Sequence, residues 1–383
     1  MAQLCNVYKL LDLSRRTQTC GICGAGSPVL FEGGPGLGKT AINEYYCASI
    51  NHWCEITILG RIPSVDVGGI YAPDFETKKL IHMVTERLLG VIDAAQGYDG
   101  INIFFDEVGN SGTEQQTAIL SLIESRVLEG RKVPDNVWYT FATNAAGTNC
   151  GSNELVESFY DRVLRARIRH DKDAAEDRTT GNVPYVSIEK EIFPRWMEWA
   201  MGDGNVDALI TAFLKMSGEN ATDDSQSVFH HYDHNSAEKG RPSPRSWTKV
   251  SRAMECGADD EEIQAVGALK VGTATWNTFW GWVNTGRHVA QYDEIITNPN
   301  DAAVPPLNMP SHAYAVICNI ATGVKRAGKD IHKEDVDNVL LYLRRLPETF
   351  TAYGWKLANG TNPKFADSPG TSAFTIEFGD LIR

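Results

Sequence analysis

At 383 residues, with 42% hydrophobic and 22% charged residues, the chain has the size and composition of a globular protein with two or three domains. A formal net charge of −13 argues against a protein that coats nucleic acid, although it leaves open a basic lining inside a pore. The sequence shows no apolar run near the ~18 residues of a membrane span, no signal-peptide pattern and no complete zinc-ligand pattern, so we expect a cytoplasmic protein without a membrane partner.

A glycine-rich loop follows the first predicted strand. The apolar spacing over Leu4–Arg15 predicts a helix, and Pro28–Phe31 predicts a buried parallel strand. The loop after this strand matches the P-loop pattern, in which glycines let backbone N–H groups approach a phosphate. We expect Lys39 to contact the β- and γ-phosphates of ATP and the Thr40 hydroxyl to ligate Mg²⁺. The predicted nucleotide-binding residues are Gly33, Gly34, Pro35, Gly36, Leu37, Gly38, Lys39 and Thr40, joined by Asp106 further along the chain.

The loop and a predicted helix at Ala41–Ile50 lead into a second strand at Glu55–Leu59, which completes a βαβ unit. The next segment, Gly60–Ala95, is longer than a simple crossover needs, with a possible hairpin at Phe75–Met83 and a helix at Val84–Ala95. Insertions of this length are usually functional or mobile, and a plain surface decoration is the alternative. We expect this segment to contact a partner rather than the nucleotide.

The segment Gly100–Glu107 predicts a strand rich in Ile and Phe that ends in two acids, which is the Walker B pattern. Because it follows a P-loop, it predicts that Asp106 holds Mg²⁺ and that Glu107 polarises the attacking water as a general base. The spacing of Ser111–Glu114 then predicts a capping box for a helix that runs through Leu128.

Another strand is predicted at Val137–Thr143, and it ends on Asn144. An amide at this point, beside the P-loop strand, can hydrogen-bond the γ-phosphate or the attacking water; the alternative is an Asn that starts a turn. Asn153–Leu164 predicts a helix, and basic and apolar residues alternate over Arg165–Arg169. The polar segment Asp171–Pro184 is a candidate hinge.

Beyond Tyr185 the pattern predicts helices without strands. The last thirty-odd residues predict mostly loop, with a final strand-like segment at Ala373–Phe378. His230, His231 and His234 are interpreted as part of a solvated loop rather than a metal site, because their neighbours disfavour a helix. The predicted helices are Ile188–Ala200, Asn205–Met216, Arg241–Ala253, Glu261–Trp282, Pro310–Ala327 and Lys333–Leu346.

With these motifs together, the chain resembles AAA+ ATPases, and more narrowly the MoxR-like branch with its CbbQ, NorQ and GvpN groups. The resemblance covers nearly the whole chain. It implies a P-loop NTPase (AAA+) core with a parallel sheet flanked by helices over residues 1–180, a helical lid over 181–290 and a helical extension over 291–383. The matching motifs are G-G-P-G-L-G-K-T, F-F-D-E-V-G-N at Phe104–Asn110, F-A-T-N at Phe141–Asn144, the segment Glu157–Val163 and S-P-R at Ser243–Arg245.

The resemblance also implies roles for single residues. Asn144 would be sensor 1, Arg245 sensor 2, and Arg162 the arginine finger that acts on the neighbouring subunit's ATP. Val163 stands where the family has Phe, and Arg165 and Arg167 are alternative fingers. The predicted catalytic residues are therefore Glu107, Asn144, Arg162 and Arg245.

For the whole protein, the resemblance implies a homo-oligomeric ring, commonly a hexamer, that hydrolyses ATP with Mg²⁺ to remodel or activate a protein client. A von Willebrand factor A-type partner is often involved in this family. The Gly60–Ala95 insertion would then face the pore or the client and grip it through Ile70, Tyr71 and Phe75. The alternatives are a DNA-handling AAA+ protein, which the acidity disfavours, and a nucleotide-dependent scaffold with little turnover, which Glu107 and Asn144 disfavour.

Overall fold

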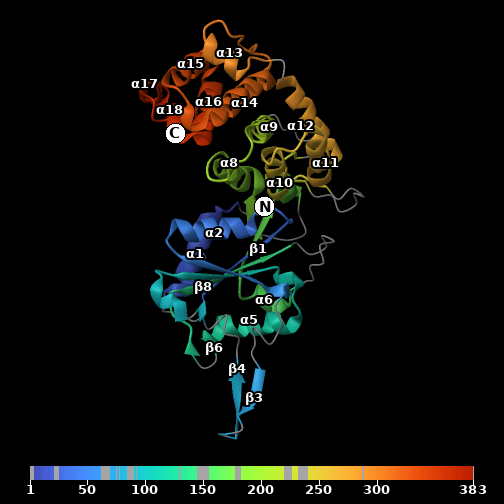
Figure 1. The fold of residues 1–383 in the computed structure, drawn as a ribbon. Helices are drawn as coiled ribbons and strands as arrows, with labels where there is room; N and C mark the ends of the chain where they lie inside the picture. Colours follow the sequence, from blue (N-terminus) through green and yellow to red (C-terminus); the bar gives the residue numbers. More distant parts are fainter. Residues whose placement is uncertain are drawn as a thin grey trace. The chain divides into compact units, whose positions relative to one another are not determined.

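The computed structural model divides into two compact units, Met1–Ile192 and Phe193–Arg383 (Figure 1). The first unit is built around a sheet, and the second consists of helices. The structure describes residues 4–20, 26–61, 70–74, 76, 78–83, 90–91, 93–128, 131–144, 155–176, 183–219, 227–231, 240–286 and 289–382. Among these residues, no helix is both long enough and apolar enough to cross a membrane.

Six parallel strands form the central sheet of the first unit, in the order β10-β9-β1-β8-β5-β2. All residues of β1 and β8 are buried, as expected for a parallel sheet with helices on both faces. The strands are β1 (Val29–Gly33), β2 (Trp53–Ile58), β5 (Ile101–Asp106), β8 (Val137–Thr143), β9 (Leu164–Arg169) and β10 (Tyr185–Ser187). Together with the helical second unit, this sheet confirms the predicted α/β architecture, a parallel sheet flanked by helices and followed by a helical region.

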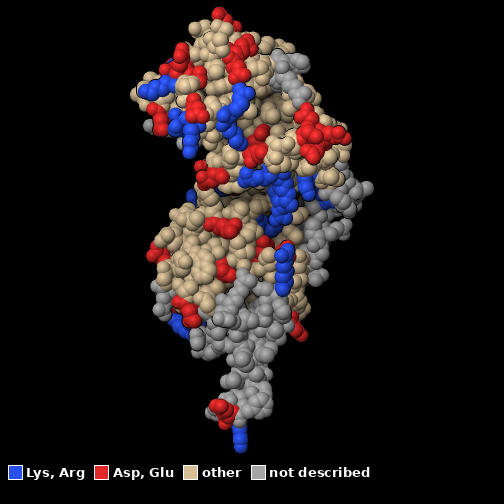
Figure 2. All heavy atoms as spheres, in the orientation of Figure 1, with Lys and Arg blue, Asp and Glu red and all other residues tan. Residues whose placement is uncertain are grey.

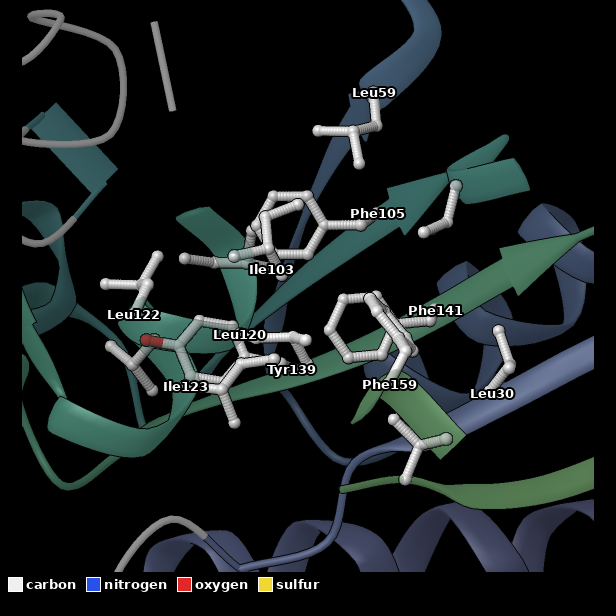
Figure 3. Close-up of a cluster of buried hydrophobic side chains, with 14 of the residues drawn as sticks. Leu30, Leu59, Ile103, Phe105, Leu120, Leu122, Ile123, Tyr139, Phe141 and Phe159 are labelled. Atoms are coloured by element: carbon white, nitrogen blue, oxygen red, sulfur yellow. The ribbon is translucent and has the colours of Figure 1, made fainter. Parts of the chain in front are cut away.

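One face of the sheet packs against α5 (Thr113–Ser125) and α6 (Glu157–Tyr160) through an aromatic core. Phe141 stacks on Phe105 with ring centroids 5.5 Å apart and meets Phe159 edge-on at 5.1 Å (Figure 3). Ring contacts in these geometries add to the stabilisation from burial alone. The core therefore fixes the two strands that end in the predicted Walker B and sensor 1 residues.

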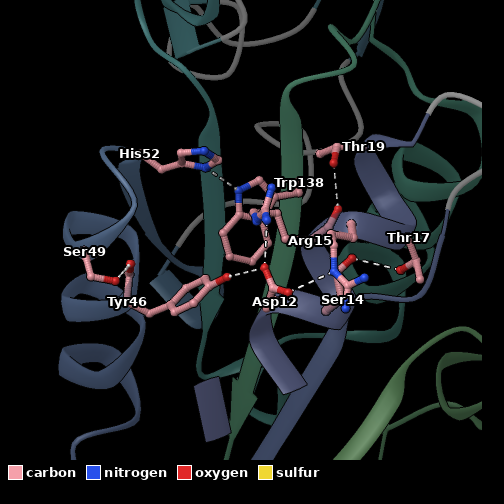
Figure 4. Close-up of polar contacts among 10 residues, drawn as sticks. Asp12, Ser14, Arg15, Thr17, Thr19, Tyr46, Ser49, His52 and Trp138 are labelled. Atoms are coloured by element: carbon pink, nitrogen blue, oxygen red, sulfur yellow. Dashed lines mark hydrogen bonds and ion pairs between the residues drawn. The ribbon is translucent and has the colours of Figure 1, made fainter. Parts of the chain in front are cut away.

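The other face packs against α1 (Val7–Thr19) and α2 (Lys39–Ser49), and polar contacts join these helices (Figure 4). Asp12 accepts hydrogen bonds from Arg15 at 2.7 Å and from the Tyr46 hydroxyl at 3.2 Å. The hydrogen bond from Arg15 lowers the pKa of Asp12. Nearby, the Trp138 indole donates to His52 Nδ1 at 3.2 Å, and burial lowers the pKa of His52, which keeps the ring neutral as an acceptor.

The predicted insertion contains an antiparallel hairpin of β3 (Ile70–Asp74) and β4 (Lys79–Met83). The hairpin thus begins five residues earlier than the predicted one. Positions 62–69 and 84–89, which hold the glycine pair and most of the predicted helix, lie outside the described residues, and so do the side chains at the apolar positions expected to grip a client. A second short hairpin joins β6 (Val127–Leu128) and β7 (Arg131–Lys132).

Two helix predictions in the first unit need correction. The N-cap of α5 is Gly112, whose N–H donates to Gln115 Oε1 at 2.6 Å, whereas the predicted cap Ser111 bonds back to Val108 O. The same helix ends before Arg126, which adopts left-handed geometry (φ +48°) and donates to backbone carbonyls of the following segment. The observed helix therefore ends three residues before the predicted end at Leu128.

The predicted helix Asn153–Leu164 is reduced, within the described residues, to the single turn α6. Leu164 instead begins β9, which pairs with β1, and the alternation of basic and apolar residues after it is a strand pattern. Tyr185–Ser187, where we predicted an all-helical region, pairs with β9 as a sixth strand. The short α7 (Asp171–Glu176) lies between these strands within the predicted hinge.

The second unit is helical throughout its described residues, apart from the connecting segments. A cluster of aromatic rings packs its interior, with Phe213 centred 5.2 Å from Phe279 and 6.0 Å from Trp247. The helices are α8 (Phe193–Met201), α9 (Ala208–Glu219), α10 (Pro244–Glu255), α11 (Asp260–Val271), α12 (Thr273–Gly286), α13 (Tyr292–Thr297), α14 (Pro310–Ala327), α15 (Lys333–Leu343), α16 (Glu348–Thr361), α17 (Pro369–Glu377) and α18 (Gly379–Ile382). The predicted boundary between lid and extension stays a prediction.

The end of the chain is helical, so the predicted loop and strand are wrong there. The segment predicted as strand-like, Ala373–Phe378, lies in α17 and its C-cap. In the structure Phe374 is fully buried, Ile376 is 86% exposed, and the rings of Phe374 and Phe378 meet at 4.7 Å, which is the i, i+4 contact of a helix. A short apolar run of this kind cannot be assigned by periodicity alone.

Candidate active site

The predicted P-loop connects β1 to α2 and has the backbone geometry that its glycines allow. Gly36 and Gly38 both adopt φ +80°, a left-handed conformation that residues with a Cβ rarely tolerate. Gly38 is the N-cap of α2, and it has no side chain that could occupy the N–H groups of the first turn. These N–H groups, at the positive end of the helix dipole, are suited to bind phosphate oxygens.

Lys39 lies at the start of α2 and is 8% exposed. Its Nζ donates to the carbonyl oxygens of Gly33 at 2.9 Å and Gly34 at 3.0 Å, and to Asn144 Oδ1 at 3.2 Å. The structure therefore brings together the predicted P-loop lysine and the predicted sensor 1 amide, which are 105 residues apart in the chain. A buried ammonium can form strong, charge-assisted hydrogen bonds with an anion such as a phosphate.

The Thr40 hydroxyl donates to Asp106 Oδ2 at 2.7 Å, so the two residues predicted to hold Mg²⁺ are in direct contact. Asp106 ends β5, and Thr40 is in the first turn of α2. A hydroxyl and a carboxylate are both hard oxygen ligands, which Mg²⁺ prefers, and Mg²⁺ in such sites keeps several waters and binds substrate phosphates. The donor set present therefore fits Mg²⁺ bound together with ATP.

Glu107 follows Asp106 and adopts φ +57°, ψ +36°. This left-handed conformation costs on the order of 1 kcal/mol or more for a residue with a Cβ, and such outliers concentrate at functional sites. Its N–H donates to Asp106 Oδ1 at 2.8 Å, and its carboxylate accepts from Asn110 Nδ2 at 3.5 Å. The turn therefore changes the chain direction directly after the Walker B aspartate.

Thr143 is a site residue that the sequence analysis missed. It precedes Asn144, and its hydroxyl accepts from the N–H of Gly109 at 3.1 Å, which ties the turn after Glu107 to the end of β8. Its signal in the sequence is a hydroxyl residue at the end of a buried strand, a position where a polar side chain needs a partner.

The three candidate finger arginines have different partners. Arg162 forms an ion pair with Glu124, whose side chain is 51% exposed, and donates to Ser158 O. Arg165 and Arg167 instead share one carboxylate: their Nε atoms lie 2.7 and 3.1 Å from the two oxygens of Glu32. Glu32, also missed by the sequence analysis, is the buried residue of β1 that precedes the P-loop, and its side chain is 5% exposed.

Arg245 lies in the second unit, near the start of α10. Ser243 is the N-cap, and its hydroxyl accepts from the N–H of Ser246 at 3.1 Å, while Pro244 is the first helical residue, as predicted. Arg245 is exposed, as is Lys249 one turn later, and Figure 2 shows basic side chains gathered over α10. Its predicted contact with the γ-phosphate stays a prediction.

Within the described residues, no group of three or more potential ligands is arranged to hold a metal ion by itself. Position 234 of the histidine cluster lies outside them. Among the described residues, the cysteines at 5, 20, 47, 54, 256 and 318 form no disulfide.

No known family model matches the chain, and no curated protein sequence matches it. Similar solved structures include RuvB from Thermotoga maritima, described as a Holliday junction branch migration motor, with 13% identity over 76% of this chain and 74% of that one (TM-score 0.33). NtrX from Brucella abortus has 13% identity over 99% of this chain and 69% of that one (TM-score 0.32).

A structure from Cytophaga hutchinsonii, provisionally described as an ATPase, has 17% identity over 68% of this chain and 84% of that one (TM-score 0.27). Such distant similarities carry no argument about activity. Any conclusion about activity therefore rests on the geometry of the site.

Proposed function

We propose that the protein is an ATPase that binds Mg²⁺ and ATP at the P-loop of its first unit and hydrolyses ATP to ADP and phosphate. The observation that carries this proposal is the pair of contacts between α2 and the strand ends: Lys39 with Asn144, and Thr40 with Asp106. The side chains in these contacts come from three separate sequence motifs: the P-loop, the predicted Walker B element and the predicted sensor 1. An accidental P-loop match would not bring the other two motifs into contact with it.

Each residue has a defined task in this proposal. The N–H groups of the P-loop and the Lys39 ammonium bind the phosphates, while Thr40 and Asp106 hold Mg²⁺. The metal neutralises charge on the phosphates when it is bound. Glu107 accepts a proton from the attacking water, and Asn144 orients that water or the γ-phosphate.

We further propose the finer assignments that the resemblance implies: a MoxR-like AAA+ protein that forms a homo-oligomeric ring, expected to be a hexamer, and remodels a protein client, with a von Willebrand factor A-type protein as a candidate partner. Arg162 supports this proposal because its side chain is 33% exposed and its ion-pair partner Glu124 is 51% exposed, so a phosphate bound by a neighbouring subunit can compete with Glu124 for the guanidinium. Arg245 would report the γ-phosphate to the helical unit.

Steady-state ATP turnover tests the enzyme assignment. We expect Glu107→Gln to keep nucleotide binding but to lose about 10²–10⁴-fold in turnover, because an amide cannot accept the proton. The matched control is Glu114→Gln, an exposed acid in the first turn of α5, which should retain turnover. Wild-type turnover in Glu107→Gln would contradict the proposed role of this residue.

The client assignment has its own test. Deleting Ile70–Lys79, most of the β3–β4 hairpin, should leave basal turnover within about a few-fold, because no proposed catalytic group is removed. Client binding, assayed by pull-down on Glu107→Gln rings, should disappear. Loss of basal turnover in a folded, assembled deletion variant would place the hairpin in the active site instead.

A further inference from the structure

Three polar side chains form a connected cluster in the core between α2 and the sheet. Asn43 of α2, Asn102 of β5 and Thr140 of β8 are each fully buried. Asn43 Nδ2 donates to Asn102 Oδ1 at 2.5 Å, and the Thr140 hydroxyl lies 3.1 Å from Asn43 Oδ1 and 3.0 Å from Asn102 Oδ1. We call this cluster the Asn43 network.

The remaining amide donors of the network also have partners. Asn102 Nδ2 donates to the backbone carbonyl of Trp138 at 3.4 Å, and Asn43 Nδ2 also lies 3.2 Å from Cys54 Sγ on β2. A buried polar network is stable only when its members are paired, and it then specifies one arrangement of the core. The network is therefore a fully buried, directional contact between α2 and the sheet.

The network joins the same helix and the same two strands as the active site, four residues away along each of them. On α2, Asn43 follows Lys39 by four residues, about one helical turn, so the two side chains lie on the same side of the helix. On β5, Asn102 precedes Asp106 by four residues, and side chains an even number of residues apart share a face of a strand. The β8 member precedes the sensor 1 amide by the same four residues.

The same three elements are thus joined twice. In the active site, α2 contacts β5 through Thr40 and Asp106, and β8 through Lys39. In the network, the same helix contacts the same two strands through a single side chain, Asn43. Apolar packing is non-directional, whereas hydrogen bonds tolerate only a narrow range of distance and angle. A shift or rotation of α2 would break the buried bonds and leave polar atoms unpaired.

We propose that Asn43, Asn102 and Thr140 are positioning residues for nucleotide hydrolysis. They fix the position of α2 along its axis and its rotation about that axis. Lys39 and Thr40 then contact the ends of β8 and β5 in the geometry that the reaction needs. This inference rests on the proposed ATPase function. A misplacement of about 1 Å in an active site can cost on the order of 10²-fold in rate, so a loosely held helix would lower turnover without any catalytic group being changed.

The decisive variant replaces the whole network by apolar residues of similar shape: Asn43→Leu, Asn102→Leu and Thr140→Val together. Because both partners of each bond are removed, this change leaves few buried polar atoms unpaired and is expected to keep the fold. We expect kcat to fall about 10- to 100-fold, with a smaller change in KM. In the absence of nucleotide, the backbone amides of α2 should exchange hydrogen at least about tenfold faster, because the helix has lost its directional anchor.

Two further variants separate positioning from general stability. Gln18→Leu removes another buried amide, which bonds α1 to the backbone of Tyr139 on the same strand, β8, at 2.8 and 3.0 Å. We expect it to lower Tm while kcat per folded molecule stays within about twofold. Thr140→Val alone, which keeps the side-chain shape, serves if the triple variant does not fold; it should lower kcat, and Thr140→Ser should retain it.

A folded triple variant, or Thr140→Val, with wild-type kcat and wild-type exchange in α2 would overturn the inference. So would a loss of kcat in Gln18→Leu as large as in the network variants, because the effect would then follow stability. Failure of the proposed function is distinguishable: the wild-type protein would show no ATP turnover at all, and amide exchange in α2 would still decide whether the network anchors the helix.

Discussion

The P-loop at the centre of the sheet and the neighbouring strand β9 hold basic side chains through different partners. At the centre, the Lys39 ammonium donates to carbonyl and amide oxygens. On β9, Arg165 and Arg167 share the carboxylate of Glu32. The neutral oxygens that Lys39 contacts can give way to a phosphate, whereas a phosphate at Arg165 or Arg167 would have to displace the buried carboxylate of Glu32. A basic side chain alone therefore does not identify a ligand site, because its partners matter as well.

The same comparison separates the three candidate fingers. Removing Arg162 from Glu124 breaks a half-exposed ion pair, which typically costs about 0–1 kcal/mol. If Arg165 or Arg167 moved to a neighbour's ATP, the Glu32 carboxylate, which is 5% exposed, would keep only one of these two arginine partners. Breaking a buried pair costs roughly 3–5 kcal/mol. This difference in cost favours Arg162 over Arg165 and Arg167 as the proposed finger.

The largest expected effect is on turnover by Arg162→Ala. If Arg162 completes the neighbour's active site, turnover should fall by about 10³-fold or more, with little change in the free energy of unfolding. Arg326→Ala, which removes an exposed ion pair with Asp293, is the matched control and should turn over normally. Mixing Arg162→Ala with Lys39→Ala subunits should restore some turnover; no recovery in a mixture shown to co-assemble would count against the finger.

Glu32→Ala should mainly affect stability. It removes the carboxylate that two partly buried arginines share, and we expect the free energy of unfolding to fall by about 3 kcal/mol. This is the lower end of the range for breaking a buried pair, because both guanidinium groups keep some access to water. Glu124→Ala, at the exposed pair, should cost less than about 1 kcal/mol. Equal losses in denaturant titrations would contradict the distinction between the two arginine sites.

A smaller effect is expected at the centre from Gly38→Ala. The added Cβ meets no atom within 4 Å, so sterics with neighbours do not matter, but φ +80° disfavours any L side chain. We expect a loss of about 1–2 kcal/mol in stability, together with weaker nucleotide binding. The Gly257→Ala variant, at φ +84° and also with no atom within 4 Å, is the control: similar destabilisation with unchanged binding.

The smallest effect concerns pH. Burial lowers the pKa of His52, so the folded protein binds a proton at this ring less readily than the unfolded chain does. Stability should therefore fall as pH drops below about 6.5, the usual pKa of histidine in an unfolded chain. His52→Gln should flatten this part of the Tm-against-pH curve. An unchanged slope below that pH would show that His52 does not contribute.

Sequence patterns could single out the residues that the structure brings together at the P-loop because each of them belongs to a local motif. The P-loop, the two acids at the end of β5 and the amide after β8 all stand at the carboxyl ends of buried strands, and these ends meet at one edge of a parallel sheet. The resemblance to AAA+ proteins added roles that periodicity does not provide. The assignments of Arg162 and Arg245 still depend on it.

The missed features depend on contacts between distant segments. Glu32 stands in a strand that otherwise looks apolar, and its two arginine partners lie more than 130 residues away, so no local pattern predicts the pairing. Asn43 and Asn102 also looked like ordinary polar residues. At the C-terminus, the segment Ala373–Phe378 looked strand-like, and only packing of Phe374 decides for a helix.

Equilibrium binding of a non-hydrolysable ATP analogue with Mg²⁺, measured by calorimetry, tests whether Lys39 belongs to a nucleotide site. We expect wild type and Glu107→Gln to bind the analogue with similar Kd. Lys39→Ala should bind at least about tenfold more weakly, because the phosphates lose a buried cation. Equal affinity of wild type and a folded Lys39→Ala variant would contradict a nucleotide site at this lysine.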